Sequence, residues 1–95
     1  MKQYECENAR QVRAKVYELT RTKPPVKTPE EKAEESAYWR DICRKVKRDA
    51  IRGVSTWDSI SDFSALDESG EEIEVRVCIG YDADNGVYLV WIEDN

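Results

Sequence analysis

The sequence predicts a single α+β domain over residues 1–95, in which two helices are followed by a three-stranded antiparallel β-meander (ααβββ) in two layers. The chain has 95 residues, of which 40% are apolar and 37% charged, a composition suited to one modest core. Apolar residues recur at helical spacing up to Gly53 and at alternate positions after it. Each half therefore has one apolar face, and the two faces bury each other most economically as a helical layer on a sheet.

The first helix is expected at about residues 8–21. Ala9, Val12, Val16 and Leu19 are spaced by three or four residues, so they fall on one side of a helix. The following segment, KPPVKTP, contains prolines that cannot donate backbone hydrogen bonds and that force the preceding residues into extended conformations. This segment is predicted to be a connector.

The second helix is expected at about residues 29–52. Thr28 is a favourable N-cap, Pro29 suits the first helical position, and Glu31 has the spacing of a capping box with Thr28. Gly53 is a natural C-terminal stop. The core-facing stripe of this helix is predicted to consist of Trp39, Ile42, Cys43, Val46 and Ala50.

Strands are expected at about residues 57–66, 71–82 and 87–93, the first of them the weakest. In the second, apolar and polar residues alternate, and one face is predicted to pack on the helices: Ile73, Val75, Val77, Ile79 and Tyr81. Asn85 and Gly86 favour a two-residue type I′ hairpin turn. Counting outward from that turn pairs Ala83 with Tyr88, Tyr81 with Val90, and Ile79 with Ile92, and places Trp91 across from Gly80.

The opposite face of the last strand carries Val87, Leu89 and Trp91. If the helices cover one face only, these residues form an exposed apolar patch, and tryptophan is enriched at binding hot spots. Burial under the N-terminal segment or under the loop at Trp57 is an equally good interpretation.

Charge is distributed unevenly along the chain. Residues 1–53 carry 14 of the 15 Lys and Arg with 9 Asp and Glu, a net charge of +5. Residues 54–95 carry 1 basic and 11 acidic residues, a net charge of −10. Such asymmetry points to partners rather than to a fold.

An acidic segment is the main candidate for binding a partner. Seven carboxylates follow one another without an intervening cation: Asp58, Asp62, Asp67, Glu68, Glu71, Glu72 and Glu74. They are predicted to face a basic protein surface, with Leu89 and Trp91 as the apolar anchor. The alternative is ordinary turn chemistry, together with charges that keep other strands from adding to a sheet edge.

A basic face on the second helix is the alternative candidate. Arg40, Arg44, Lys47 and Arg48 lie within about 100° of one another at helical spacing and would suit nucleic-acid phosphates. A solvated face that pairs with the acidic half is the favoured interpretation, since that half repels nucleic acid.

The sequence offers little for catalysis, and the protein is predicted not to be an enzyme. It has no histidine, and its three cysteines lack metal-binding spacing, so no cofactor and no metal are expected. Cys6, Cys43 and Cys78 are predicted to be reduced packing thiols. Asp82 and Asp84 resemble the start of a calcium loop, but the required glycine is misplaced, so a hairpin turn is expected. No apolar run suggests a membrane span or signal peptide, and a soluble, cytoplasmic protein is expected.

In composition and size, the chain resembles small, acidic, histidine-poor proteins of phages and other mobile elements, among them anti-CRISPR proteins and DNA mimics. The resemblance implies a stoichiometric inhibitor or adaptor that binds a protein with a basic surface. Two further interpretations stay open: a nucleic-acid-associated protein, and a homodimer formed through the face that contains Trp91.

Overall fold

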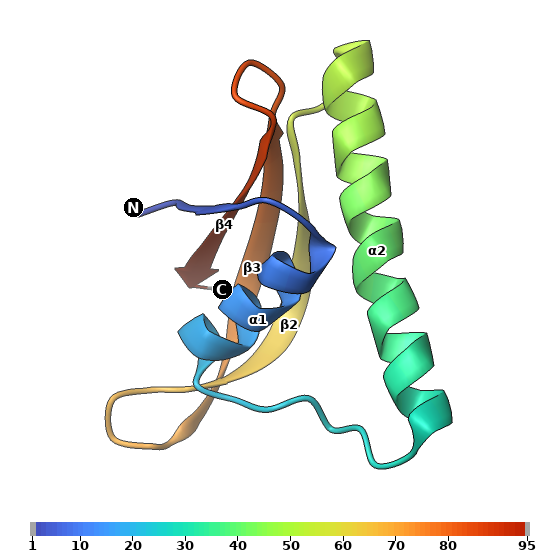
Figure 1. The fold of residues 1–95 in the computed structure, drawn as a ribbon. Coiled ribbons are helices and arrows are strands. Elements are labelled where there is room, and N and C mark those ends of the chain that lie inside the picture. The colour runs from blue at the N-terminus through green and yellow to red at the C-terminus, as the bar shows by residue number, and fades with distance from the viewer. Residues whose placement is uncertain (1, 95) are drawn as a thin grey trace.

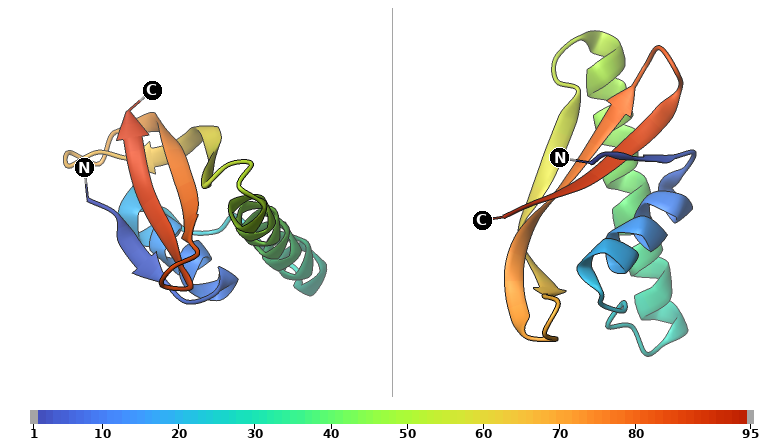
Figure 2. Two further views of the ribbon diagram at one scale, coloured as in Figure 1. Left: turned by 90° about the horizontal axis from the view of Figure 1, so that it is seen from above. Right: turned by 90° about the vertical axis from the view of Figure 1, so that its left-hand side faces the viewer.

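The computed structural model describes residues 2–94 and places two helices on one side of a four-stranded antiparallel sheet (Figure 1). The elements are β1 (Tyr4–Cys6), α1 (Ala9–Thr20), α2 (Pro29–Arg52), β2 (Trp57–Leu66), β3 (Glu72–Asp82) and β4 (Val87–Asp94). The strand order in the sheet is β1-β4-β3-β2. The right-hand view of Figure 2 shows both helices on one side of the sheet. The predicted α+β class is thus confirmed.

The prediction of three strands was wrong by one, because β1 forms the fourth. Tyr4 pairs with Val90 and Cys6 with Tyr88, so β1 extends the sheet beyond β4. A strand of three residues is too short for an alternating pattern to be recognised, and its hydrogen bonds come from a strand more than eighty residues away.

Both helices begin with an N-cap hydrogen bond, and that of α2 is made by the predicted cap residue. The Thr28 side chain accepts a hydrogen bond from the Glu31 amide at 3.1 Å, and the Asn8 side chain accepts one from the Gln11 amide at 2.9 Å. Gly53 ends α2 with a left-handed φ of 73°, a conformation that costs glycine little. The predicted helix bounds are confirmed to within a residue.

The β3–β4 hairpin corrects the predicted turn and register. Tyr81 pairs with Tyr88, Ile79 with Val90, and Cys78 with Trp91, two positions away from the expected pairing. The cause is a four-residue loop in which Gly86 has a positive φ and Asn85 does not, so the turn is not type I′. A shift of two residues leaves every side chain on its expected face.

The loop itself is organised by Asp82. Its carboxylate accepts hydrogen bonds from the amides of Asp84 at 3.0 Å and Asn85 at 3.2 Å, which is turn chemistry as expected.

The core lies between the helices and one face of the sheet. Val12 and Val16 of α1 and Trp39, Cys43 and Val46 of α2 are buried there. They pack on the strand residues Val75, Val77, Ile79 and Val90. Ile73 was predicted to belong to this core but is 38% exposed, because the β2–β3 turn beside it projects past α1 (Figure 1).

The two helices are held together by Glu35 on α2. Its carboxylate accepts hydrogen bonds from the Tyr17 hydroxyl at 3.0 Å and the Trp39 indole at 2.7 Å, and it forms a salt bridge with Arg13. Burial and this carboxylate together raise the pKa of Tyr17 to about 12. The partly buried network fixes α1 against the first half of α2.

Candidate functional site

The sheet face that points away from the helices carries a cluster of apolar side chains. The strand pairing places Trp57 of β2 beside Gly80 of β3, and Leu89 and Trp91 on the same side of β4. The rings of Trp57 and Trp91 are 6.1 Å apart between centroids. Trp91 is only 8% exposed, whereas Trp57 is 46% exposed, so Trp57 covers its neighbour and itself meets solvent.

Gly80 makes this packing possible. A Cβ atom at Gly80 would lie 3.2 Å from the Trp91 ring and 3.1 Å from the carbonyl oxygen of Thr56. A side chain at this position would therefore displace the Trp91 indole or the backbone of Thr56, which directly precedes β2. The sequence left open whether Val87, Leu89 and Trp91 are exposed or covered. In the structure, Trp91 is buried, while Val87 and Leu89 are half-buried.

Carboxylates lie on the same side of the sheet as this apolar cluster. We call that side of the sheet, with the cluster and these carboxylates, the tryptophan face. The strand pairing places five on the same side of the sheet: Glu5, Glu72, Glu74, Asp82 and Glu93. Among the described strand residues on that side, Arg76 is the single cation, and its guanidinium lies 3.8 Å from Glu93. Glu93 also accepts a hydrogen bond from the Trp91 indole at 3.2 Å. The tryptophan face thus combines an apolar cluster with a strongly negative charge.

The seven carboxylates of the predicted acidic segment do not form one surface. Glu72 and Glu74 lie exposed on the tryptophan face. The predicted anchor residues Leu89 and Trp91 are on the same side of the sheet, but Leu89 is half-buried and Trp91 is buried. The other five carboxylates lie elsewhere: on the helix-covered side, at a bulge, or in the β2–β3 turn.

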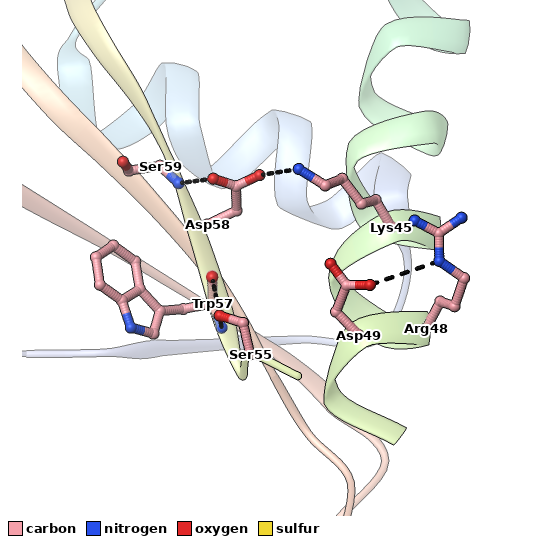
Figure 3. Close-up of polar contacts among 7 residues, drawn as sticks. All are labelled: Lys45, Arg48, Asp49, Ser55, Trp57, Asp58 and Ser59. Carbon is pink, nitrogen blue, oxygen red and sulfur yellow. Dashed lines mark hydrogen bonds and ion pairs between the residues drawn. The ribbon is translucent and has the colours of Figure 1, made fainter. Parts of the chain in front are cut away.

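Asp58 points toward the helices, opposite to its neighbour Trp57 (Figure 3). Its carboxylate is 3.0 Å from the Lys45 ammonium of α2 and accepts a hydrogen bond from the Ser59 amide at 2.8 Å. Burial opposes ionisation, but these hydrogen bonds outweigh it, and the pKa of Asp58 is lowered. Asp58 therefore holds β2 to α2 and belongs to the fold.

The β2–β3 turn uses Asp67 structurally. Its carboxylate accepts hydrogen bonds from the Ser69 hydroxyl at 2.6 Å and from the amides of Ser69 and Glu71, which lowers its pKa. Glu68 and Glu71 are exposed in the same turn. For Asp67, the alternative interpretation as turn chemistry describes the structure.

Asp62 marks an irregularity in β2. The register with β3 shifts between Ile60 and Phe63, and Asp62 has a left-handed φ of 56°. β2 is an edge strand of the sheet, and bulges and charges at such an edge hinder pairing with other strands.

The alternative basic face lies along α2, and most of its charges already have neighbours. Arg44 is 3.4 Å from Asp41, Arg48 is 3.5 Å from Asp49 (Figure 3), and the Lys47 ammonium lies 5.6 Å from the centre of the Tyr81 ring. In the described part of the chain, none of the four predicted residues forms a salt bridge with the acidic half; Lys45, which was not in that set, forms one with Asp58. The helix pairs its own charges instead.

The three cysteines are free and buried, as expected of packing thiols. Burial raises the pKa of Cys43 to about 12 and that of Cys78 to about 11, and it also raises the pKa of Cys6. Such thiols are poor nucleophiles at neutral pH. Within residues 2–94, no group of three or more His, Cys, Asp or Glu side chains is arranged to hold a metal ion.

Three residues of this surface were not among the binding residues predicted from the sequence: Trp57, Glu93 and Glu5. Ile60 of β2 faces the helices, and Trp57 lies three positions before it. Because side chains alternate along a strand, the sequence pattern already places Trp57 on the outward side. Glu5 joins the surface only because β1 pairs with β4.

Comparisons with known proteins add no relative. The chain matches no protein-family description, no curated protein and no solved structure. In the described part of the chain, neither helix is long and apolar enough to cross a membrane.

Proposed function

We propose that the protein is a non-enzymatic binding module, an inhibitor or adaptor, that uses the tryptophan face to bind a protein with a basic surface. The observation that supports the proposal is the half-exposed Trp57, which is seated on Trp91 and shares its side of the sheet with carboxylates, a side that neither described helix covers (Figure 2). Aromatic side chains at the centre of a patch are the usual source of binding energy, and a polar rim excludes water from them.

The charge on the tryptophan face defines the chemistry of the partner. Five carboxylates against one guanidinium attract a surface of lysines and arginines and disfavour acidic ones. Long-range attraction of this kind accelerates association, and salt weakens it. The partner is therefore expected to present cations around an apolar recess that receives Trp57.

Nucleic acid is a weaker proposal than a protein partner. The α2 face has few cations without neighbouring carboxylates, and the sheet adds a strongly negative surface to the same small molecule. The resemblance to small inhibitors of mobile elements remains an expectation about the class of partner.

The test begins with capture of a partner from the source cell and continues with the purified pair. Glu72→Lys combined with Glu74→Lys should slow association at least tenfold at low salt, and the difference should shrink as salt rises. Trp57→Ala should instead speed dissociation at least tenfold. The double reversal Glu68→Lys with Glu71→Lys is the matched control, because it makes the same charge change in the turn; it should have the smaller effect.

The proposal fails if the association rate is indifferent to both salt and the change at Glu72 and Glu74. It also fails if Trp57→Ala leaves the dissociation rate unchanged while the variant remains folded.

A further inference from the structure

The molecule also has a cleft between the first turns of α1 and the first half of α2, and the chemistry of this cleft differs from that of the tryptophan face. Its volume is about 530 Å³, within the range of small-molecule sites. Its lining includes Ala9, Arg10, Arg13, Ser36, Trp39 and Arg40. Three guanidinium groups and no carboxylate thus line a cavity that has an indole and a methyl group in its wall.

Two cations of this cleft lack the neighbouring carboxylates that Arg44 and Arg48 have. In the described part of the chain, neither Arg10 nor Arg40 forms a salt bridge. Arg13 is paired with Glu35 through its Nε atom, and its guanidinium lies 5.6 Å from the centre of the Tyr17 ring; within residues 2–94, its terminal nitrogens form no salt bridge. Counting Glu35, which lies behind Arg13, the local net charge is about +2 at neutral pH.

Part of this positive charge lies in the first turn of α1, where helices ordinarily carry acidic residues. The first turn of α1 contains no acidic residue and does contain Arg10, although the positive end of the helix dipole disfavours a cation there. The local repulsion among these cations is relieved when an anion enters the cleft, and that relief favours binding.

We propose that this cleft binds a small phosphate monoester that carries a flat aromatic group, such as an aryl phosphate or, through its base, a nucleoside monophosphate. A phosphate monoester carries close to two negative charges at neutral pH and so matches the local charge, whereas a carboxylate matches half of it. Guanidinium groups bind phosphate oxygens in pairs, which suits Arg10 and Arg40 on opposite walls. The flat group would rest against Ala9 and reach the edge of Trp39, of which 2% is exposed.

The full chain, labelled with ¹⁵N, is titrated with four probes and followed by NMR. Phenyl phosphate carries both the dianion and the flat group, inorganic phosphate lacks the ring, benzoate has the ring with one charge, and AMP is a nucleoside monophosphate. Phenyl phosphate and AMP should bind with dissociation constants below about 1 mM, and the two partial probes should bind at least tenfold more weakly. The indole resonance of Trp39 should move during the titration, because its N–H donates to Glu35 beside the cleft, while those of Trp57 and Trp91 stay in place.

Variants separate this site from general attraction to cations. Arg40→Gln and Arg10→Gln should each weaken binding of phenyl phosphate at least tenfold. Arg44→Gln is the matched control: it lies one turn further along α2, beside Asp41 and outside the cleft, and should change affinity less than twofold. All three positions are exposed, so the variants should melt as the unaltered chain does.

Equal losses in the Arg40 and Arg44 variants would overturn the proposal, as would equal affinities for phenyl phosphate and inorganic phosphate. Absence of any shift at Trp39 up to 10 mM of either monoester, roughly tenfold above the expected constant, would overturn it as well. A single-stranded oligonucleotide that binds through Arg44 and Arg48, without mononucleotide binding, would do so in favour of a nucleic-acid face. None of these results bears on the tryptophan face, so the two proposals stand or fall separately.

Discussion

The two faces of the sheet follow the same alternating pattern but differ in what covers them. On the helix-covered face, Val77, Ile79 and Val90 are completely buried beneath α1 and α2. On the tryptophan face, burial comes from within the layer itself, where Trp57 covers Trp91. Burial of apolar surface therefore stabilises the fold mainly on the helix-covered face. The tryptophan face still exposes apolar surface to water, and a partner can bury it.

The largest effect should come from a charge placed on the covered face. Val77→Asp puts a carboxylate at a fully buried position with no cation facing it among the described residues, and should lower the free energy of unfolding by at least about 3 kcal/mol. Chemical denaturation followed by circular dichroism measures the change.

Ser64→Asp provides the control, since it adds the same group at an exposed position on the opposite face. Its free energy of unfolding should stay within about 0.5 kcal/mol of the unaltered chain. Similar effects of both substitutions would contradict the assignment of the two faces.

The next effect distinguishes the two tryptophans of the tryptophan face. Trp91→Ala removes a ring that is 8% exposed and packed across Gly80, and should cost about 3 kcal/mol. Trp57→Ala removes a half-exposed ring and should cost about 1 kcal/mol, mainly through the lost contact with Trp91. Thermal melts of both variants test the order, and a reversed order would show that Trp57 is structural and unsuited to be the anchor.

Alkaline pH should weaken the fold through buried thiols on both faces of the sheet, because the pKa of Cys43 beneath the helices and that of Cys78 on the tryptophan face are both raised. The pKa of Cys43 rises from 9.0 in the unfolded chain to about 12 in the fold, so the folded state keeps a proton that the unfolded state loses. Stability is therefore full below about pH 9 and declines as pH rises toward 12, by up to about 1.4 kcal/mol per pH unit for this thiol. Tyr17 adds to the decline above pH 10, since its pKa rises from 10.0 to about 12.

Melting temperatures measured between pH 7 and 11, with and without Cys43→Ala, check this. The variant should be less stable at pH 7 but should lose less stability on alkalinisation. Parallel pH profiles for the two proteins would contradict a role for this thiol.

The comparison of faces also shows how far the sequence can be interpreted. Periodicity predicted both helices and the inward faces of β3 and β4, because a stripe from Trp39 to Ala50 or an alternation from Ile73 to Tyr81 is a local property. It could not predict β1, whose pairing with β4 is set by folding over the whole length of the chain.

The acidic segment was harder to interpret for a related reason. Asp58, Asp62 and Asp67 look alike in sequence, yet one faces a lysine of α2, one sits at a bulge and one organises a turn. Their roles depend on strand register and on which element faces them, and neither follows from spacing. The cleft with Arg10 and Arg40 was inaccessible to sequence reasoning because it requires the relative placement of two helices.

The smallest effect concerns Asp58 and Lys45, which join the covered face of β2 to α2. Both side chains are substantially exposed, at 39% and 55%, so solvent screens their attraction, and a double-mutant cycle with Asp58→Asn and Lys45→Gln should give a coupling of about 0.5 kcal/mol. Because the fold lowers the pKa of Asp58, this contribution is present above the unfolded-state pKa near 3.8 and is lost as pH falls through the lower folded-state pKa. The coupling should therefore persist at pH 7, vanish near pH 2 and shrink at 1 M salt. A coupling that survives acid or salt would mean that the two residues interact through packing of the lysine stem rather than through charge, and that β2 is held to α2 by apolar contact alone.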